Sequence, residues 1–218
     1  MPKSTSERRP QRRSQETRDR LVDAALREFA ERGFDGASTR TIAARAEIAQ
    51  SAVPYHFNTK EALWRAAADR IFGSFKEQFA GRSSGLAGVD LRTRTRLMLL
   101  DYVRFAAAHP ELHSFMLQAG TGGGDRLEWL IETHVQPSVD QLRTVFAQLE
   151  ASSMALPVRP DHLFYMLIGA VATPYALAAE FELTMGEDPF SKSMVEAHAE
   201  AVVRLFFPEL VSSEEDSA

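Results

Sequence analysis

Cysteine is absent from the 218 residues, so neither a disulfide nor a thiolate metal site can form. No apolar run follows the basic N-terminus, so we expect no secretory signal and a cytoplasmic protein. No alternation of apolar and polar residues is long enough to predict a strand, and no internal repeat is present. These absences leave an all-α fold as the expectation.

Residues that could carry catalysis or hold a metal or cofactor form no familiar pattern. His109 and His113 are four residues apart, but Pro110 interrupts the helix between them. The TGGG stretch at 121–124 lacks the Lys and Ser/Thr of a phosphate-binding loop. No Ser/His/Asp set stands out. We therefore expect no metal site, no cofactor and no catalytic residue.

Charge is distributed unevenly along the chain, whose net charge is -5. Residues 1–60 carry 12 Lys and Arg against 8 Asp and Glu, whereas residues 61–218 carry 13 against 22. A basic front part on an acidic body indicates that a polyanion binds the front only.

Helical periodicity and turn residues predict about nine helices in four regions. A long helix is expected from Asp125 to about Ser152 with a kink at Pro137, and another from Pro160 to near Gly186. The expected regions are a flexible basic arm (1–13), a helix-turn-helix DNA-binding domain (14–60), a ligand-binding and dimerisation domain (61–210) and a disordered acidic tail (211–218). The arm either lies along DNA or only aids solubility.

The region 14–60 has the pattern of a three-helix head. Ser14 or Thr17 caps a first helix that ends at Gly33, and Ser38 or Thr39 caps a second. A third short helix follows near residues 50–57. This order is typical of a helix-turn-helix, which places its second helix in the major groove of DNA.

This head resembles the tetracycline-repressor (TetR) family of bacterial transcription regulators over about residues 18–63. The matching positions are Leu21, Ala24, Ala25, Phe29, Gly33, Thr39, Ile42, Ala43, Ala46, His56, Phe57, Lys60 and Leu63. The resemblance implies a homodimer that binds a palindromic operator in double-stranded DNA. It also implies a helical sensor domain whose small-molecule effector moves the fourth helix and shifts the two heads out of register.

Two positions depart from the family pattern. Glu47 stands where the turn usually has Gly, and it would incur roughly 1 kcal/mol or more in a left-handed conformation. Pro54 stands where Tyr is usual, so a phosphate contact is lost there. The missing N–H of Pro54 is tolerated if it falls in the first turn of the helix. Tyr55 is a candidate to replace the lost phosphate contact.

Position in the motif suggests how the head would contact DNA. Gln50, Ser51 and Ala52 are expected to reach base edges, with Gln suited to adenine and Ala to a thymine methyl. Phosphate contacts are expected from Thr39, Arg40, Tyr55, His56 and Lys60. The alternative for Tyr55 and His56 is that they only pack.

The body is rich in aromatic residues and Met, which favours a largely apolar or aromatic ligand. The candidate ligand-binding residues are Met98, Tyr102, Phe105, Met116, Trp129, His134, Phe164 and Tyr175. The alternative is that these residues belong to the hydrophobic core. Helical spacing alone does not distinguish residues that line a pocket from residues of the core.

Residues 163–179 contain no charge, but Pro174 interrupts them, and we expect a buried helix rather than a membrane span. A helix that is apolar on all faces needs cover on all faces, which indicates a dimer. The candidate interface residues are Gly169, Ala172, Thr173, Ala176, Met194 and Leu205.

The sequence therefore favours a DNA-binding transcriptional regulator, a repressor released by its ligand. One rival is a structural or adaptor protein of the same fold without a small ligand. Another is a helical enzyme with an incidental head, for which the sequence supplies no catalytic set.

Overall fold

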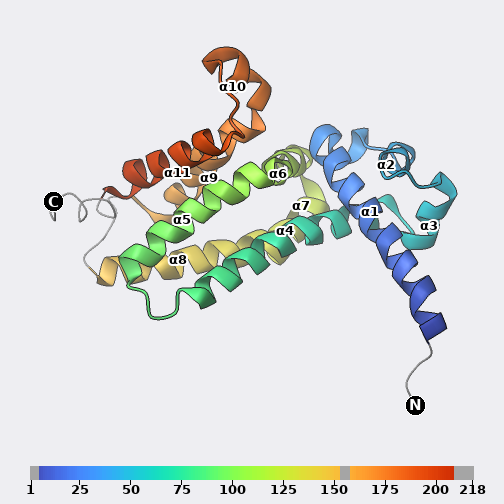
Figure 1. Cartoon of the computed structure of the whole chain (residues 1–218), viewed down its shortest axis with the longest axis horizontal. Coiled ribbons are helices and arrows are strands. Elements are labelled where there is room, and N and C mark those ends of the chain that lie inside the picture. The colour runs from blue at the N-terminus through green and yellow to red at the C-terminus, as the bar shows by residue number, and fades with distance from the viewer. Residues whose placement is uncertain (1–4, 153–157, 209–218) are drawn as a thin grey trace. The chain divides into compact units, whose positions relative to one another are not determined.

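The computed structural model describes residues 5–152 and 158–208, with side chains from residue 11 onward. Every regular element in these ranges is helical, which confirms the all-α prediction. The tail expected at 211–218 lies outside them. In chain order the helices are α1 (Thr5–Gly36), α2 (Thr39–Arg45), α3 (Val53–His56), α4 (Lys60–Gly85), α5 (Leu91–Ala108), α6 (Pro110–Gly122), α7 (Gly124–Leu130), α8 (Gln136–Ala151), α9 (Pro160–Ala176), α10 (Ala178–Met185) and α11 (Lys192–Phe206) (Figure 1).

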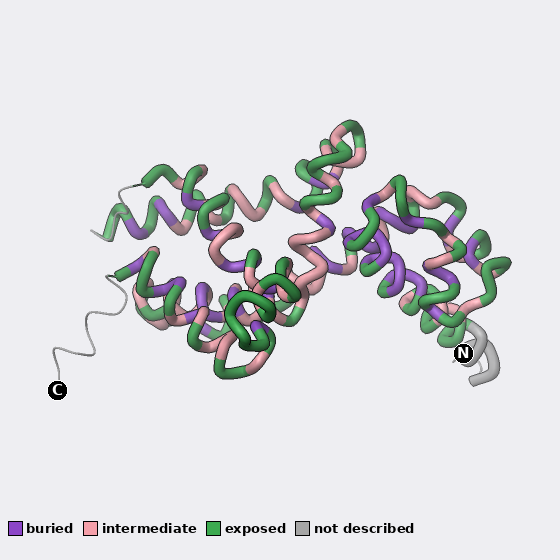
Figure 2. Tube along the Cα trace, turned by 90° about the horizontal axis from the view of Figure 1, so that it is seen from above, coloured by how far each residue is buried: buried purple, intermediate pink, exposed green. Residues whose placement is uncertain are grey.

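The described residues form two compact units. Unit 1 contains the chain up to Ser74 and the segment Ser114–Leu127, and unit 2 contains Phe75–His113 and the chain from Glu128 onward. In each unit the buried residues, purple in Figure 2, alternate with exposed ones along the helices, as amphipathic packing requires.

The basic stretch expected as a flexible arm over residues 1–13 is helical from Thr5, so that expectation is wrong for its described part. Ser14 and Thr17 accordingly lie inside α1 and do not cap it. The Thr17 hydroxyl instead donates to the carbonyl of Arg13 at 2.9 Å. Glu16 pairs with Arg12 one turn earlier, with 3.0 Å between Nε and Oε1, and such pairs stabilise a helix that carries few apolar residues.

The end of α1 and the start of α2 follow the expected signals. Gly33 interrupts the helical conformation with φ 68 and ψ 179, values that favour glycine. The Ser38 hydroxyl oxygen accepts the backbone N–H of Thr41 at 3.0 Å and so caps α2. Before the break at Gly33, α1 buries Leu21, Ala25 and Phe29 completely or almost so.

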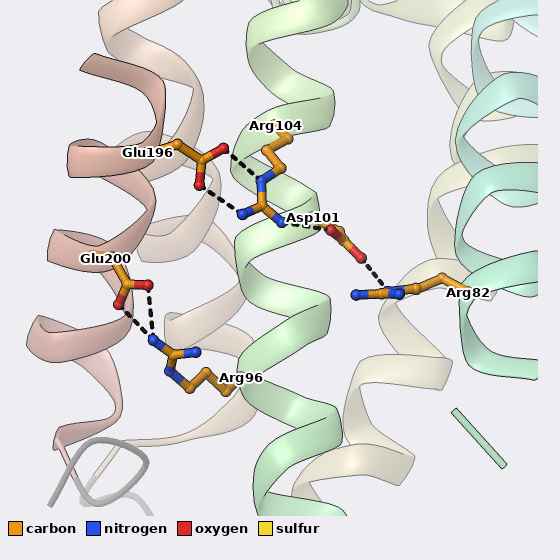
Figure 3. Close-up of polar contacts among 6 residues, drawn as sticks. All are labelled: Arg82, Arg96, Asp101, Arg104, Glu196 and Glu200. Carbon is orange, nitrogen blue, oxygen red and sulfur yellow. Dashed lines mark hydrogen bonds and ion pairs between the residues drawn. The ribbon is translucent and has the colours of Figure 1, made fainter. Parts of the chain in front are cut away.

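A hydrophobic core in unit 2 joins α5, α8, α9 and α11. It includes Val103, Phe146, Val171 and Val203, and Tyr102 packs against it. Two groups of ion pairs join α5 to α11 beside this core (Figure 3). Arg104 of α5 binds Glu196 of α11 through two hydrogen bonds of 2.9 and 2.6 Å.

Asp101 extends the Arg104 group to α4. Its carboxylate lies 3.0 Å from the Arg104 guanidinium and 2.6 Å from the Arg82 Nε. The hydrogen bonds from Arg104 lower the pKa of Glu196, so this carboxylate remains charged at neutral pH. Arg96 and Glu200 form a second α5–α11 pair, with 2.8 Å between Nη2 and Oε1. These pairs fix the register of α11 along α5.

Two prolines divide the long helices expected in unit 2, which is why the helices outnumber the expected nine. A π-helical turn, η2 (Ile131–Val135), comes just before Pro137, in agreement with the expected kink. The helix expected from Pro160 to Gly186 is broken at Leu177 into α9 and α10, which are bent by 75°. Pro174 lies in the last turn before this break.

Each proline removes the N–H that would bond the carbonyl four residues earlier. For Pro174 that carbonyl belongs to Ala170, and the Nε2 of His198 on α11 lies 3.0 Å from it. For Pro137 it belongs to Thr133, and the Nζ of Lys76 on α4 lies 3.5 Å from it. Side chains of neighbouring helices therefore supply the donors that the prolines remove.

In the described residues no single helix is long and apolar enough to cross a membrane, although α9 and α10 taken together meet that length and composition test.

We predict that His198→Ala destabilises the protein by about 1 kcal/mol, because the half-buried Ala170 carbonyl loses its donor. In a Pro174→Ala background the backbone N–H of residue 174 can bond that carbonyl, so the same change should cost less. Urea unfolding of the four proteins gives the coupling energy, and the ring packing of His198 cancels in the cycle. Equal costs in the two backgrounds would contradict this role.

Candidate DNA-binding interface

The recognition segment begins with a 3₁₀ turn, η1 (Gln50–Ala52), and continues as the four-residue α3. Val53 and Phe57 are buried, whereas Gln50, Ser51 and Tyr55 are exposed. The side of this segment that faces away from the core is therefore polar. The Thr59 hydroxyl oxygen accepts the N–H of Ala62 at 3.0 Å and caps the start of α4.

Tyr55 is 81% exposed, and the ring contact found for it is an edge-on approach to His56 at 5.1 Å. The interpretation that Tyr55 only packs is therefore wrong. His56 is half-buried, as are Thr39 and Ala52, and Arg40 is exposed. All eight predicted contact residues lie on α2, η1, α3 or the first residue of α4, and none is buried.

Lys60 is held at the start of α4. Its Nζ lies 4.6 Å from the centroid of the Phe34 ring and donates to the carbonyl of Asp35 at 3.4 Å. These contacts orient the ammonium group while leaving it half-exposed. Arg18 of α1 likewise lies over the ring of Phe57, 4.9 Å from its centroid, so a second cation is fixed near α3.

Glu47 adopts the conformation expected to strain it. Its φ is 54, and among the described residues it is the one non-glycine with a positive φ. The backbone N–H groups of Glu47 and Ile48 donate to the carbonyls of Ala44 and Ala43. The exposed Glu47 carboxylate accepts from Arg20 of α1 at 3.1 Å. The turn thus keeps the usual left-handed geometry at the cost of strain.

Pro54 occupies the first turn of α3, where its missing N–H has no intrahelical acceptor. Pro54 thus lies in the first turn of α3, as expected. The helix closes one turn later with the Phe57 N–H donating to the Val53 carbonyl at 2.9 Å.

Sequence reasoning missed the charge cluster that fastens α2 to α1. Arg45 donates to both carboxylate oxygens of Glu31 at 2.6 Å, which lowers the pKa of Glu31 and raises that of Arg45. Glu28 is completely buried, and its carboxylate lies 3.5 Å from Arg45 and 3.4 Å from Arg32. Glu28 lies among the apolar residues on the buried face of α1. An acidic residue at such a position is the one sequence signal that could have pointed to a buried ion pair.

The candidate ligand residues do not gather into one site. Tyr102 and Phe105 belong to an aromatic cluster with Phe75 and Phe79, whose ring centroids are 4.4–6.3 Å apart. Burial raises the pKa of the Tyr102 hydroxyl to about 12.

The other candidates are placed separately. The Trp129 and His134 rings meet at 5.3 Å, and the Phe164 ring contacts the Tyr165 ring at the same distance. Tyr175 belongs to the core of unit 2, whereas Met116 falls in unit 1. The interpretation as core is therefore right for Tyr175. Met98 is half-buried on α5.

The candidate interface residues lie on α9 and α11. Thr173 is exposed and Gly169 half-buried. They form a stripe with Tyr165 of α9 (74% exposed) and with Leu177 (50% exposed), the residue that follows α9. Ala172 is buried within its own chain, so its inclusion is wrong. Ala176 and Met194 are half-buried.

Leu205 of α11 is 75% exposed, and the exposed Ala197 and Ala201 share its face with Met194. Sequence reasoning did not identify the two alanines as part of this face. In the described residues, no group of three or more His, Asp or Glu side chains could hold a metal ion.

The chain is similar to known DNA-binding regulators. Residues 21–67 match the family described as bacterial regulatory proteins, tetR family. The probable HTH-type transcriptional regulator YttP of Bacillus subtilis is 18% identical over 73% of this chain and 77% of its own. The HTH-type transcriptional regulator RutR of Escherichia coli K12 is 23% identical over 76% and 77%.

Solved structures show the same fold over most of the chain. AibR in complex with isovaleryl coenzyme A and operator DNA gives a TM-score of 0.69 at 20% identity, covering 88% of this chain and 98% of that one. FadR from Bacillus subtilis in complex with stearoyl-CoA gives 0.64 at 15% identity, with coverage of 86% and 96%.

We predict that Glu47→Gly is more stable than Glu47→Ala by about 1 kcal/mol, because glycine adopts a positive φ without strain. Both variants lose the pair with Arg20, so the comparison isolates the backbone. Chemical denaturation of the two variants measures the difference. A Glu47→Ala protein as stable as Glu47→Gly would show that the turn is not strained.

Proposed function

We propose that this chain, whose residues 21–67 match the tetR family of bacterial regulatory proteins, is a dimeric repressor released from its operator by a small, largely apolar effector. The observation that carries the proposal is the recognition segment of unit 1. It exposes Gln50, Ser51 and Tyr55 while its apolar residues are buried. A short helix with this arrangement suits the major groove, where side chains read base edges.

Base and phosphate contacts have different roles in this proposal. Gln50 and Ser51 at the start of the segment read bases, and Ala52 contacts a thymine methyl. Lys60 and Arg40, with Thr39, Tyr55 and His56, bind phosphates and set the register of the head on DNA.

We predict that Lys60→Ala weakens binding to every duplex sequence and reduces the salt slope of log K by about one. The reason is that one phosphate contact, and the counterion it displaces, is lost. Fluorescence anisotropy at several salt concentrations measures both effects.

Lys60→Arg, which keeps the charge, should retain most of the slope. If Lys60→Ala lost affinity for some sequences and not for others, the residue would be reading bases.

The effector site is proposed at the aromatic cluster of Phe75, Phe79, Tyr102 and Phe105. Four rings offer an apolar surface, and the buried Tyr102 hydroxyl offers one polar group that can orient a ligand. The isovaleryl and stearoyl groups bound by AibR and FadR are also apolar. Both the cluster and these relatives support an apolar acyl or aromatic effector.

We predict that at least one compound among aromatic carboxylates, fatty acids and acyl-CoA thioesters raises the melting temperature by several degrees. A ligand at about 100 times its Kd adds roughly 2.7 kcal/mol. The same compound should release the protein from DNA.

In the Phe79→Ala variant, the compound should raise the melting temperature by less than it does in the wild type, each measured against the same protein without ligand. Phe190→Ala, outside the cluster, should leave the shift unchanged. If no compound stabilises the protein, the rival function of a DNA-bound adaptor without a ligand is favoured.

The dimer is proposed to form through the exposed faces of α9 and α11. Tyr165 and Thr173 on α9, Leu177 just after it and Leu205 on α11 leave surface uncovered in the single chain. The small residues Gly169 and Ala201 beside them allow close approach of a second copy.

We predict that Thr173→Arg shifts the protein toward monomer, because an arginine in the middle of the α9 stripe places charge and bulk in the interface. Light scattering after size exclusion measures the mass. Thr144→Arg, at an exposed position of α8, is the control and should remain dimeric. An unchanged mass for Thr173→Arg would place the interface elsewhere.

A further inference from the structure

Unit 1 contains a cavity of about 170 Å³ that none of the candidate ligand residues lines. Residues 32–36 at the end of α1 form one wall and Trp64 of α4 another. The third wall consists of residues from the 118–126 segment, where α6 ends and α7 begins. Pockets for drug-sized ligands measure roughly 300–1,000 Å³, so this cavity suits a ligand of few atoms.

The cavity wall carries more positive than negative charge. Arg32, Arg126 and Asp35 supply its charged groups. The Arg32 Nε lies 3.4 Å from the buried Glu28 carboxylate and is thereby partly neutralised. Among the described residues Arg126 has no carboxylate partner, and its guanidinium lies 3.8 Å from the centroid of the Phe34 ring. The Phe34 ring thus holds the Arg126 guanidinium in place, and its N–H groups can still donate hydrogen bonds to an anion.

Gln118 adds a polar group to the same wall. Gly33 has a positive φ, and a Cβ at this position would lie 2.8 Å from the Gln118 Oε1. Glycine therefore permits α6 to approach the end of α1 closely and brings the Gln118 amide to the cavity. A guanidinium and an amide on one wall are the donors that a carboxylate or phosphate accepts.

We propose that this cavity binds a small organic anion, a carboxylate or a phosphate monoester, with Arg126 as its main contact and Arg32 and Gln118 as further donors. The site lies next to the candidate DNA interface, because the Phe34 ring that Arg126 covers also lies 4.6 Å from the Lys60 Nζ. A bound anion places negative charge beside Lys60 and lowers its attraction for a DNA phosphate. This effect on DNA rests on the proposed function, whereas binding of the anion does not.

Binding is tested on the full chain without DNA. The two Trp residues are Trp64 and Trp129, so a Trp129→Phe protein reports fluorescence from Trp64 at the cavity. Phosphoglycolate, malonate and inorganic phosphate are titrated at constant ionic strength, with sodium chloride as the reference. We expect saturable quenching or enhancement by phosphoglycolate or malonate.

Arg126→Gln in the same background should weaken that binding by about tenfold or more, the loss expected for a charge-assisted contact. Arg27→Gln, which removes an exposed arginine of α1 outside the cavity, is the matched control and should bind as before. Absence of saturable binding, or equal weakening in the two variants, would overturn the site.

The effect on DNA is measured separately by anisotropy with a generic duplex, because a phosphate contact does not depend on sequence. The anion should weaken DNA binding by the wild-type chain and leave that of Arg126→Gln unchanged. If the anion binds but DNA affinity stays the same, the proposed link to Lys60 is overturned. If the protein without anion fails to bind any duplex, the proposed function fails, and the Trp64 titration still decides on the site.

Discussion

Burial of one face of α1 is the constraint on which the candidate interface depends. Leu21, Ala25 and Phe29 are at most 1% exposed, and Ile42 of α2 is fully buried. Helices of seven and four residues, the lengths of α2 and α3, are not stable in water by themselves. They persist because their apolar residues complete a core with α1. The residues left on their outer sides are then available to DNA.

Irregular residues would leave some backbone groups without hydrogen-bond partners, and neighbouring groups supply the missing bonds. The strained Glu47 keeps two hydrogen bonds in its turn, and Pro54 lies where no N–H is needed. In unit 2, His198 and Lys76 reach the carbonyls that Pro174 and Pro137 leave free. Irregular positions are therefore retained where a neighbouring group compensates for them.

The sequence was sufficient for positions whose signals are local. A cap at Ser38 or Thr39, the break at Gly33 and the strain at Glu47 were expected from residues adjacent in the chain, and the cap is Ser38. The start of α1 was misplaced because the stretch before Ser14 has almost no apolar residues. Exposed arginine and glutamate side chains one turn apart can nevertheless extend a helix without burial.

Contacts between distant segments could not be read from the sequence. The cavity in unit 1 combines residues 32–36 with residues about 90 positions later, and no periodicity relates them. The candidate ligand residues were chosen by side-chain type, and type does not distinguish the packed Tyr175 from the Tyr102 cluster. The ligand-site residues therefore stay a prediction, because helix packing, and not helix formation, decides which of them share a surface.

In the proposed function the outer side of the recognition segment reads bases. In vitro selection of duplexes by the wild-type chain and by Gln50→Lys tests it most directly. We expect symmetric half-sites for both proteins, with adenine replaced by guanine at one position of each half-site, because Lys prefers guanine where Gln prefers adenine. An identical selected sequence for the two proteins, or no enrichment by the wild type, would contradict it.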